Sequence, residues 1–563
     1  MKKYKISAIG IAIVMLLGIL SCERDLSSGN FEIPTINDIT IEYFICGNGH
    51  EGVEFEVALG SHFTLKPRLT FELGEASSTY IYAWYEINPN PVETGASRLI
   101  SQERTLSLLI DAEFSDTSRP YRMMFRITDQ HTSVTYSRIF TMQVRNPLQI
   151  GWYALTERAN GFEIDVVALF MGELRQQNNV LDFLGSELPR TDGQIPKNLL
   201  MFPNMSAPTI TNRDMTNYTI MIQTDVATNM VRSADFSFDP SFDISAFVLL
   251  NHPYIRPGFN PNRLIPMLST ATAGSATRLY MHYNDNFYIF NRQGPVIPFW
   301  EPINRMRGVA NSRFNVAPFI AGNLGQGVVL FDMDNNRFVR HLIPFMFFVT
   351  TPSHEFLTSV PLTDLPTAHF SFNHNIERLL YMTTYHLHLG FAIVKDSSLG
   401  SYRVLRFQVN ATSAVTLAPV TFESSDNALI ESFEHFAMHF EGTFLYMATA
   451  DRLFRANLAA PPPTTLADIT DQLNLPAGYR IATLDFLSTN GGGNSFQPFL
   501  TVGSYNPNGV VGENGRLDMF DIDTGIGATG DLTLRIHTQP DDEELPMTFT
   551  GIGRPVSVAY RGR

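Results

Sequence analysis

Residues 443–457 read TFLYMATADRLFRAN, and this pattern decides the fold of most of the chain. An apolar run of strand length, 443–448, is followed by a polar turn at 449–451 and a second strand-like run at 452–457. Two such runs joined by a short polar turn are typical of a β-hairpin. The segment therefore predicts antiparallel β structure.

The same pattern recurs from Gly151 to the C-terminus. The clearest copies are residues 278–283 with 287–291, 327–332 with 337–340, 402–410, and 516–521. Their spacing is irregular, about 45–65 residues per unit, as in a β-propeller whose blades carry long loops. We therefore predict an all-β chain in which residues 148–563 form a β-propeller of roughly seven blades. Six or eight blades, or a separate β-barrel or pair of sandwiches, are the alternatives.

Two details complete the prediction for this region. The final run, 554–560, alternates like a strand, and we expect it to close the ring by pairing near Trp152. Helical patterns are scarce, and we predict only two short helices, over residues 427–433 and 466–473.

The region 38–147 has a different pattern, in which short runs of alternating apolar and polar residues are separated by turn residues. The runs lie at 63–66, 80–85, 105–108, 121–128 and 137–144. This pattern predicts a β-sandwich with Trp84 as a buried core aromatic residue. The chain has only two cysteines, Cys22 and Cys46, so any immunoglobulin-like relation is architectural. We expect Cys46 to be a small core residue.

The N-terminus has the features of an export signal. Lys2, Lys3 and Lys5 precede an apolar run from residue 6 to 20, and Ser21-Cys22 follow it. Residues 19–22 (ILSC) resemble a bacterial lipobox, in which the cysteine is acylated. We predict a signal peptide over 1–21, lipid attachment (palmitate among the acyl chains) at Cys22 and a flexible tether over 22–37. A spanning anchor is the alternative, although the apolar run is shorter than the roughly 20 residues that a span needs.

The formal net charge is −15, and removing the lysines of residues 1–21 makes the mature chain more acidic still. Such a chain is poorly suited to binding nucleic acid or an anionic membrane surface through charge. We therefore expect no nucleic-acid partner, and contact with the membrane only through the N-terminal lipid.

Candidate site residues are few. Eight of fourteen histidines lie between His341 and His439, and His386 and His388 would share one face of a strand, as a metal site requires. Packed or loop histidines are the simpler interpretation. Residues 332–336 (DMDNN) resemble the start of a calcium loop, but Arg337 stands where that loop needs glycine, which favours a hairpin turn.

Trp300 and Tyr505 are weak candidates for stacking on a ligand, and they would be equally ordinary as core residues. The chain has no Gly-x-Ser-x-Gly motif and no His-Glu-x-x-His motif. We therefore predict no catalytic residue and no cofactor, and leave open whether the chain is an enzyme.

The order of these parts resembles the PKD-like family of Bacteroidota lipoproteins. The resemblance rests on the lipobox, residues 82–85 (YAWY) and 121–129 of the sandwich, the entry at 151–153 (GWY) and the terminal 551–556 (GIGRPV). It implies a lipid-anchored protein of the outer membrane that faces the cell exterior and carries no established catalytic residues. It also implies an accessory role beside SusC/SusD-type TonB-dependent transporters, which import oligosaccharides or peptides.

The expected function is therefore to bind or present an oligosaccharide or peptide ligand for nutrient uptake. Two alternatives remain open. The chain could be a propeller-type hydrolase or lyase acting on an extracellular polymer. Acids or histidines would then lie around the central funnel of the propeller. It could instead be an adhesion or structural protein of the cell surface.

Overall fold

A computed structural model describes residues 35–561, except 48, 88–96, 111, 115–118, 149, 171–172, 202–217, 234, 245–247, 249–259, 268–277, 292–300, 310–311, 324–326, 342–357, 387–388, 410–413, 462, 488–498, 525–526 and 539–543. The described part is nearly all β structure and divides into two units, residues 1–145 and 146–563. No helix in this part is long and apolar enough to span a membrane.

Unit 1 is a sandwich of two sheets. The first sheet has the order β2 (Glu51–Gly52), β1 (Ile39–Cys46), β4 (His62–Phe71) and β7 (Leu106–Leu109). The second has the order β3 (Glu54–Ala58), β9 (Thr135–Arg145), β8 (Tyr121–Asp129), β5 (Tyr80–Ile87) and β6 (Ser97–Ser101). Two 3-10 turns, η1 (Glu75–Ser77) and η2 (Ala112–Phe114), complete the unit. The predicted sandwich is confirmed.

The sandwich core lies where the two sheets face each other. Burial alternates along β8, so Met123, Phe125 and Ile127 point inward while Arg122 is exposed. Phe44 of the first sheet contacts Trp84 of the second with ring centroids 5.7 Å apart. Trp84 is fully buried, as predicted. Cys46, which we expected in the core, is only half-buried near the end of β1.

Unit 2 contains seven antiparallel sheets of three to five strands among its described residues. Each sheet is built from consecutive strands, apart from sheet 1, which the last strand of the chain joins, and sheet 7, which β39 joins after the separate pair β37–β38. Sheets 1 to 3 are β12 (Glu173–Gln177), β11 (Gly161–Phe170), β10 (Gly151–Arg158) and β40 (Arg554–Arg561); β13 (Pro196–Met201), β14 (Tyr218–Thr224), β15 (Thr228–Arg232) and β16 (Phe238–Asp243); and β17 (Arg263–Met267), β18 (Arg278–Tyr283) and β19 (Asn286–Asn291).

Sheets 4 to 7 continue in chain order. They are β20 (Ala321–Asn323), β21 (Gly327–Asp332), β22 (Arg337–His341) and β23 (Ser359–Pro361); β24 (Ile376–His386), β25 (Leu389–Asp396), β26 (Tyr402–Val409), β27 (Ala414–Thr416) and β28 (Val420–Thr421); β29 (His435–Met438), β30 (Phe444–Ala448), β31 (Leu453–Asn457) and β32 (Leu466–Asp468); and β33 (Arg480–Leu487), β34 (Phe499–Tyr505), β35 (Gly515–Ile522), β36 (Leu532–Leu534) and β39 (Thr548–Ile552). A separate pair is β37 (Ile536–Thr538) with β38 (Glu544–Pro546).

Short helices connect some of the sheets of unit 2: α2 (Val180–Phe183), α3 (Asn427–Glu431), and the 3-10 turns η5 (Ser424–Asp426) and η6 (Thr470–Leu473). The helix predicted over 427–433 is present as α3. The helix predicted over 466–473 is wrong. Residues 466–468 form β32 instead, because they pair with β31, and only 470–473 make a 3-10 turn.

The hairpins form as predicted because polar turns separate apolar runs. The β18–β19 turn places Asn284 at φ 48° and Asp285 at φ 54°, the left-handed conformations of a type I′ turn. The central strands are buried on both faces, as in β30, where all five residues are buried. A strand buried on both faces implies that each sheet packs between two others.

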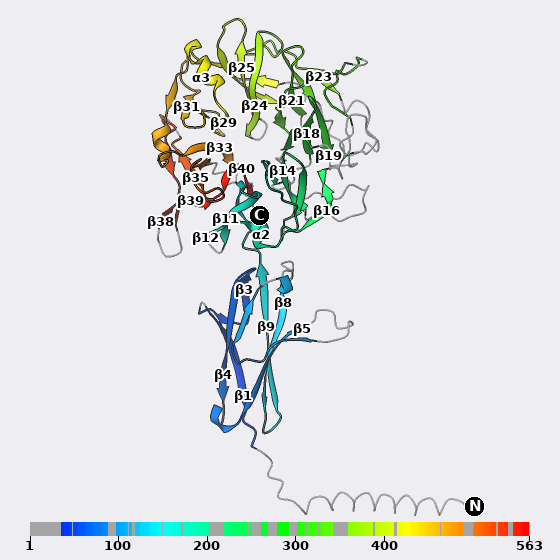
Figure 1. The fold of residues 1–563 in the computed structure, drawn as a ribbon, viewed down its shortest axis with the longest axis vertical. Coiled ribbons are helices and arrows are strands. Elements are labelled where there is room, and N and C mark those ends of the chain that lie inside the picture. Colours follow the sequence, from blue (N-terminus) through cyan, green and yellow to red (C-terminus); the bar gives the residue numbers. More distant parts are fainter. Residues whose placement is uncertain are drawn as a thin grey trace, which may run out of the picture. The chain divides into compact units, whose positions relative to one another are not determined.

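Neighbouring sheets share apolar cores around unit 2. Such cores join sheets 1 and 2, 3 and 4, 4 and 5, 5 and 6, 6 and 7, and finally 7 and 1. Sheets 2 and 3 meet through the contact of β13 with β17. In Figure 1 the sheets follow one another around the unit in the order of the colour bar, until red β40 reaches sheet 1, where it pairs with β10.

The C-terminal strand joins the first sheet of unit 2. β40 pairs with β10, so that Tyr560 stands opposite Trp152, with their ring centroids 5.2 Å apart. The pairing predicted near Trp152 is therefore confirmed. β40 also contacts β13 on one side and β33 on the other.

Candidate functional site

The edge strands of the sheets surround a cavity in unit 2, which we call the inner cavity. Its volume is about 450 Å³, within the range of small-molecule sites. Strands β17, β24, β29, β33 and β40 contribute most of its wall, each being the edge strand of its sheet. The side chains lining it that matter for its chemistry are Arg263, Phe319, Tyr381, Glu434, His435, Phe436, Thr483, Asp485, Thr501 and Ser557.

Part of the wall is aromatic. The ring of Phe319 lies 5.3 Å from that of Tyr381, and Tyr381 stacks on Phe436 at 4.9 Å with 25° between the planes. The guanidinium of Arg263 sits over Phe319 at 5.5 Å, and its Nη1 donates to the carbonyl of Pro318 at 3.3 Å. Contacts across three sheets therefore hold these rings in fixed positions.

Polar groups of sheet 7 form another part of the wall. Asp485 of β33 stands opposite Thr501 of β34. The Asp485 side chain is exposed to the inner cavity, yet the residues of the cavity wall bury the carboxyl within the protein. This burial raises the pKa of Asp485 to about 6, although the Phe486 amide and the charge of Arg263 act to lower it. The carboxyl therefore changes charge near neutral pH.

Thr501 brings a second polar group with unused hydrogen-bonding capacity. Its side chain is only 1% exposed, and among the described residues its Oγ1 has no hydrogen-bond partner. Thr483, two residues before Asp485 on the same face of β33, is already used, since its Oγ1 accepts from the Gly503 amide at 3.1 Å. The atom has almost no accessible surface, so the hydroxyl is an unsatisfied polar group within the wall and does not face the inner cavity.

A histidine and an acid lie at the sheet 6 side of the inner cavity. His435 begins β29, and Glu434 precedes it. Burial lowers the pKa of His435, while the charge of Glu434 partly opposes this shift. The imidazole is therefore neutral at pH 7 and can act as either donor or acceptor.

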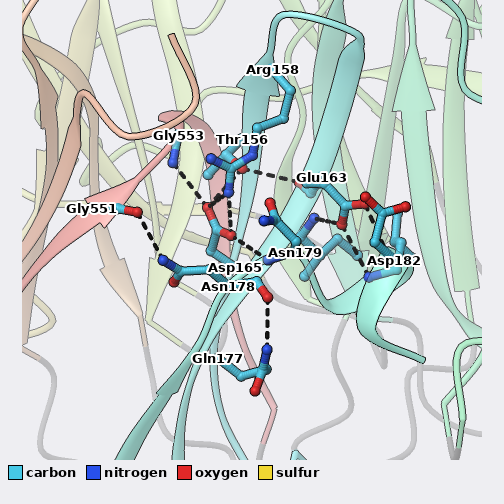
Figure 2. Close-up of polar contacts among 12 residues, drawn as sticks. Thr156, Arg158, Glu163, Asp165, Gln177, Asn178, Asn179, Asp182, Gly551 and Gly553 are labelled. Atoms are coloured by element: carbon cyan, nitrogen blue, oxygen red, sulfur yellow. Dashed lines mark hydrogen bonds and ion pairs between the residues drawn. The ribbon is translucent and has the colours of Figure 1, made fainter. Parts of the chain in front are cut away.

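A second cavity, of about 540 Å³, lies where sheets 1 and 7 meet, and Figure 2 shows its polar contacts. Asp165 accepts from Thr156 Oγ1 at 2.9 Å, from Arg158 Nη2 at 2.6 Å, and from the amides of Asn179 and Gly553. Glu163 accepts from the amides at the start of α2 and from Arg190. Because protein groups already satisfy both carboxylates, this network serves to fix the fold.

The residues proposed from sequence lie elsewhere. Cys22, Trp300 and His388 lie outside the described residues, as does the His386 side chain, although His386 is the last residue of β24. The described residues contain no group of three or more His, Cys, Asp or Glu side chains that could hold a metal ion. Tyr505 is half-buried at the end of β34, beneath the Arg554 guanidinium at 4.6 Å, and does not line the inner cavity.

Two other predictions from sequence can be checked in the described residues. Asp332 accepts from the amides of Asp334 and Asn335 and from Arg337 Nε, which is the expected hairpin turn. Among the histidines, His435 lines the inner cavity. His439 is buried against Phe440, and burial lowers its pKa to about 4.

Sequence reasoning missed the residues that matter most in the inner cavity. Arg263, Tyr381 and Asp485 belong to three different sheets and form no local motif. One sequence signal could have found them. Each lies on the first strand of its sheet, and that strand is the edge that faces the cavity. Only the order of the sheets around unit 2 brings these three side chains to one wall.

Comparison with known proteins agrees with the sandwich. A model of the PKD-like family matches residues 27–187, which include every strand of the sandwich and continue through β10, β11, β12 and α2 of unit 2. The N-terminal part of the chain is therefore PKD-like. No curated protein sequence matches the chain.

Solved structures similar to this chain have β-rich folds. A quinonprotein alcohol dehydrogenase-like protein from Bacteroides thetaiotaomicron is 10% identical, with TM-score 0.38, covering 93% of this chain and 100% of its own. Hsv2p of Kluyveromyces lactis is also 10% identical, with TM-score 0.34 and coverage of 68% and 93%. The WD40 domain of SCAP from fission yeast is 9% identical, with TM-score 0.28 and coverage of 58% and 64%. At these scores, no property of these proteins extends to this chain.

Proposed function

We propose that unit 2 is a seven-bladed β-propeller whose inner cavity binds a ligand, and that the chain is a lipid-anchored accessory of a nutrient-uptake system. The blade count is supported by the seven sheets in chain order, the apolar cores between neighbours and the pairing of the last strand with the first sheet. In a propeller the innermost strand of each blade lines a central channel, and the edge strands that carry Arg263, Tyr381 and Asp485 around the inner cavity fit that arrangement.

One observation carries the binding role: the inner cavity joins fixed aromatic rings to the open carboxyl of Asp485 and the guanidinium of Arg263. Ligand sites combine apolar and aromatic surface with convergent polar groups, and both kinds of group line this cavity. The expected ligand is an oligosaccharide or peptide. The rigid sheets hold the site in shape, so little ordering free energy is lost on binding.

The location rests on the N-terminus and on the PKD-like region. The basic residues, the short apolar run and Ser21-Cys22 support export and acylation at Cys22. The PKD-like match covers the sandwich, which follows the tether in the sequence, and continues into the start of unit 2. A lipid anchor raises the local concentration at the outer membrane, so modest affinity for a SusC/SusD-like transporter suffices.

Co-purification tests the proposed function. The tagged full-length protein is extracted from its native outer membrane in mild detergent and its partners are identified by mass spectrometry. We expect stoichiometric recovery of a TonB-dependent transporter with its lid lipoprotein, and loss of both with Cys22→Ser, which removes the acylated thiol. Recovery of the protein alone, at full yield and in the outer membrane, would contradict the accessory role.

An enzyme that acts on an extracellular polymer is the second candidate. It is favoured by Asp485, whose pKa of about 6 lets the carboxyl take up and release a proton near that pH, and by His435 in the same cavity, since a general acid or base works best with a pKa near the operating pH. Incubation with plant and microbial polysaccharides, followed by mass spectrometry of the products, tests it. Product formation that Asp485→Asn abolishes would favour the enzyme over the binding protein.

A further inference from the structure

The walls of the inner cavity carry functional groups that restrict what can fill it. Once it is ionised, the carboxylate of Asp485 can accept hydrogen bonds but cannot donate them. Arg263 brings a positive charge, and its guanidinium is oriented by Phe319 and the Pro318 carbonyl. Tyr381 and Phe436 add flat apolar surface.

Several ligand classes fit these walls poorly. A purely apolar ligand would displace water from the Asp485 carboxylate and the Arg263 guanidinium without replacing its hydrogen bonds, which costs free energy. A cation would meet Arg263, and an anion would meet Asp485 and the neighbouring Glu434. Because the cavity carries charges of opposite sign, it favours a neutral ligand that is rich in groups able to donate and accept hydrogen bonds.

We infer that the inner cavity binds a neutral carbohydrate, with a sugar ring against Tyr381 and its aromatic neighbours and with hydroxyls bonded to Asp485 and Arg263. Sugar hydroxyls donate to a carboxylate and accept from a guanidinium, so one ligand satisfies both charges. The C–H face of a sugar ring is apolar and covers an aromatic ring well. This inference rests on the proposed ligand-binding function and narrows its ligand from oligosaccharide or peptide to carbohydrate.

Asp485 and Tyr381 have separate roles in this arrangement. Asp485 supplies directional acceptors, so it selects for hydroxyls at fixed positions. Tyr381 supplies contact area, and packing against Phe319 and Phe436 fixes its ring. A site built to pair with hydroxyls discriminates strongly against analogues that lack them.

Calorimetric titration of the full-length protein in mild detergent tests the inference. The probes are neutral oligosaccharides of glucose, xylose, mannose and N-acetylglucosamine, with neutral tripeptides as the comparison ligands. We expect at least one oligosaccharide to bind with a Kd in the millimolar range or tighter and the tripeptides not to bind. Asp485→Asn should weaken that binding about tenfold or more, corresponding to about 1.4 kcal/mol.

Matched variants separate the site from general effects. Tyr381→Leu should abolish oligosaccharide binding, while Tyr381→Phe, which keeps the ring, should retain most of it. Asp521→Asn, which removes an exposed carboxylate from β35 of the same sheet, should change nothing. Circular dichroism and melting temperature show that each variant is folded.

Three results would overturn the inference: binding of tripeptides but of no oligosaccharide, no binding of any probe, or oligosaccharide binding that both Asp485→Asn and Tyr381→Leu leave intact. The uptake role is tested independently. Recovery of a transporter with a protein that binds no sugar would overturn only the ligand class. Sugar binding without a transporter would overturn only the accessory role.

Discussion

The backbone amide of Gly553 donates a hydrogen bond of 3.0 Å to Oδ2 of Asp165, although 388 residues separate the two. Gly553 stands between β39, which belongs to sheet 7, and β40, which belongs to sheet 1. Asp165 therefore binds the point where the chain crosses from the last sheet to the first. Figure 2 shows the contact within the polar network of β10 and β11.

Glycine is required at this crossing. A Cβ on Gly553 would lie 2.6 Å from the Glu157 carbonyl oxygen and 2.8 Å from Thr156 Cβ. A Cβ on Gly515 of β35 would lie 1.9 Å from the Gly553 carbonyl oxygen. The terminal sequence GIGRPV thus lets two backbones approach closely, and the nearby entry sequence GWY supplies the strand that receives β40.

Removing the carboxylate at this crossing should destabilise unit 2. Asp165→Ala leaves the buried Arg158 guanidinium, which is only 9% exposed, without its acceptor. Breaking such a buried pair costs about 3–5 kcal/mol. Chemical unfolding measures this loss. Asp182→Ala, which removes a carboxylate that is 59% exposed in the same network, should cost about 1 kcal/mol or less. Equal losses for both variants would contradict the role of Asp165.

The packing of β40 on sheet 7 should be sensitive to one methyl group. A Cβ on Gly503 would lie 2.3 Å from Thr483 Oγ1 and 2.8 Å from Pro555 Cγ. We expect Gly503→Ala to lower the free energy of unfolding by about 1–3 kcal/mol through overpacking. The control is Gly52→Ala, whose Cβ would meet only an ordinary contact at 3.7 Å. A Gly503→Ala protein as stable as the wild type would show that β40 does not pack on sheet 7 in this way.

Asp485 should make stability depend on pH. Its pKa in the folded state, about 6, lies above the value of an unfolded aspartate, so the folded state binds the proton more tightly. This stabilising contribution is fully present below about pH 4 and is lost as pH rises through about 6. Asp485→Asn should therefore melt at a higher temperature than the wild type at pH 8, and the difference should shrink towards pH 4. A difference that is constant with pH would contradict the raised pKa.

Ligand affinity should depend on the same titration of Asp485. It should rise with pH, whereas the contribution of Asp485 to stability falls with pH. If the Asp485 carboxylate accepts hydrogen bonds from sugar hydroxyls, protonation below about pH 6 removes acceptor capacity. Affinity should then fall as pH decreases from 8 to 5, and Asp485→Asn should be flat over that range. Titration calorimetry at several pH values measures this slope. A wild-type affinity that does not change with pH would exclude Asp485 from the contact.

Much of the β structure could be predicted from sequence because its signals are local. Apolar runs and polar turns within about fifteen residues specify the hairpins, and the period-two runs specify the sandwich. The predicted helix at 466–473 failed because pairing of 466–468 with β31 overrides a weak local preference. Tertiary pairing cannot be read from such a short segment.

The inner cavity could not be predicted, since it depends on which strands face one another. Arg263, Tyr381 and Asp485 look like ordinary strand residues in sequence, and their importance comes from the edges on which they lie. Tyr505 is a candidate ligand contact in sequence because it precedes an Asn- and Gly-rich turn, yet it lies beneath Arg554 and outside the cavity. Aromatic residues near turns are common, and composition alone does not distinguish a ligand surface from packing.

The most direct test asks whether the inner cavity is needed for nutrient uptake. Cells that carry Asp485→Asn at the chromosomal locus are given the radiolabelled cargo of the co-purified transporter, and initial uptake is compared with that of wild-type cells at equal protein level. We predict that the variant lowers uptake at limiting cargo concentration and that saturating cargo restores it, while Asp521→Asn behaves as wild type. Uptake by Asp485→Asn cells that equals wild type at every concentration would contradict the account.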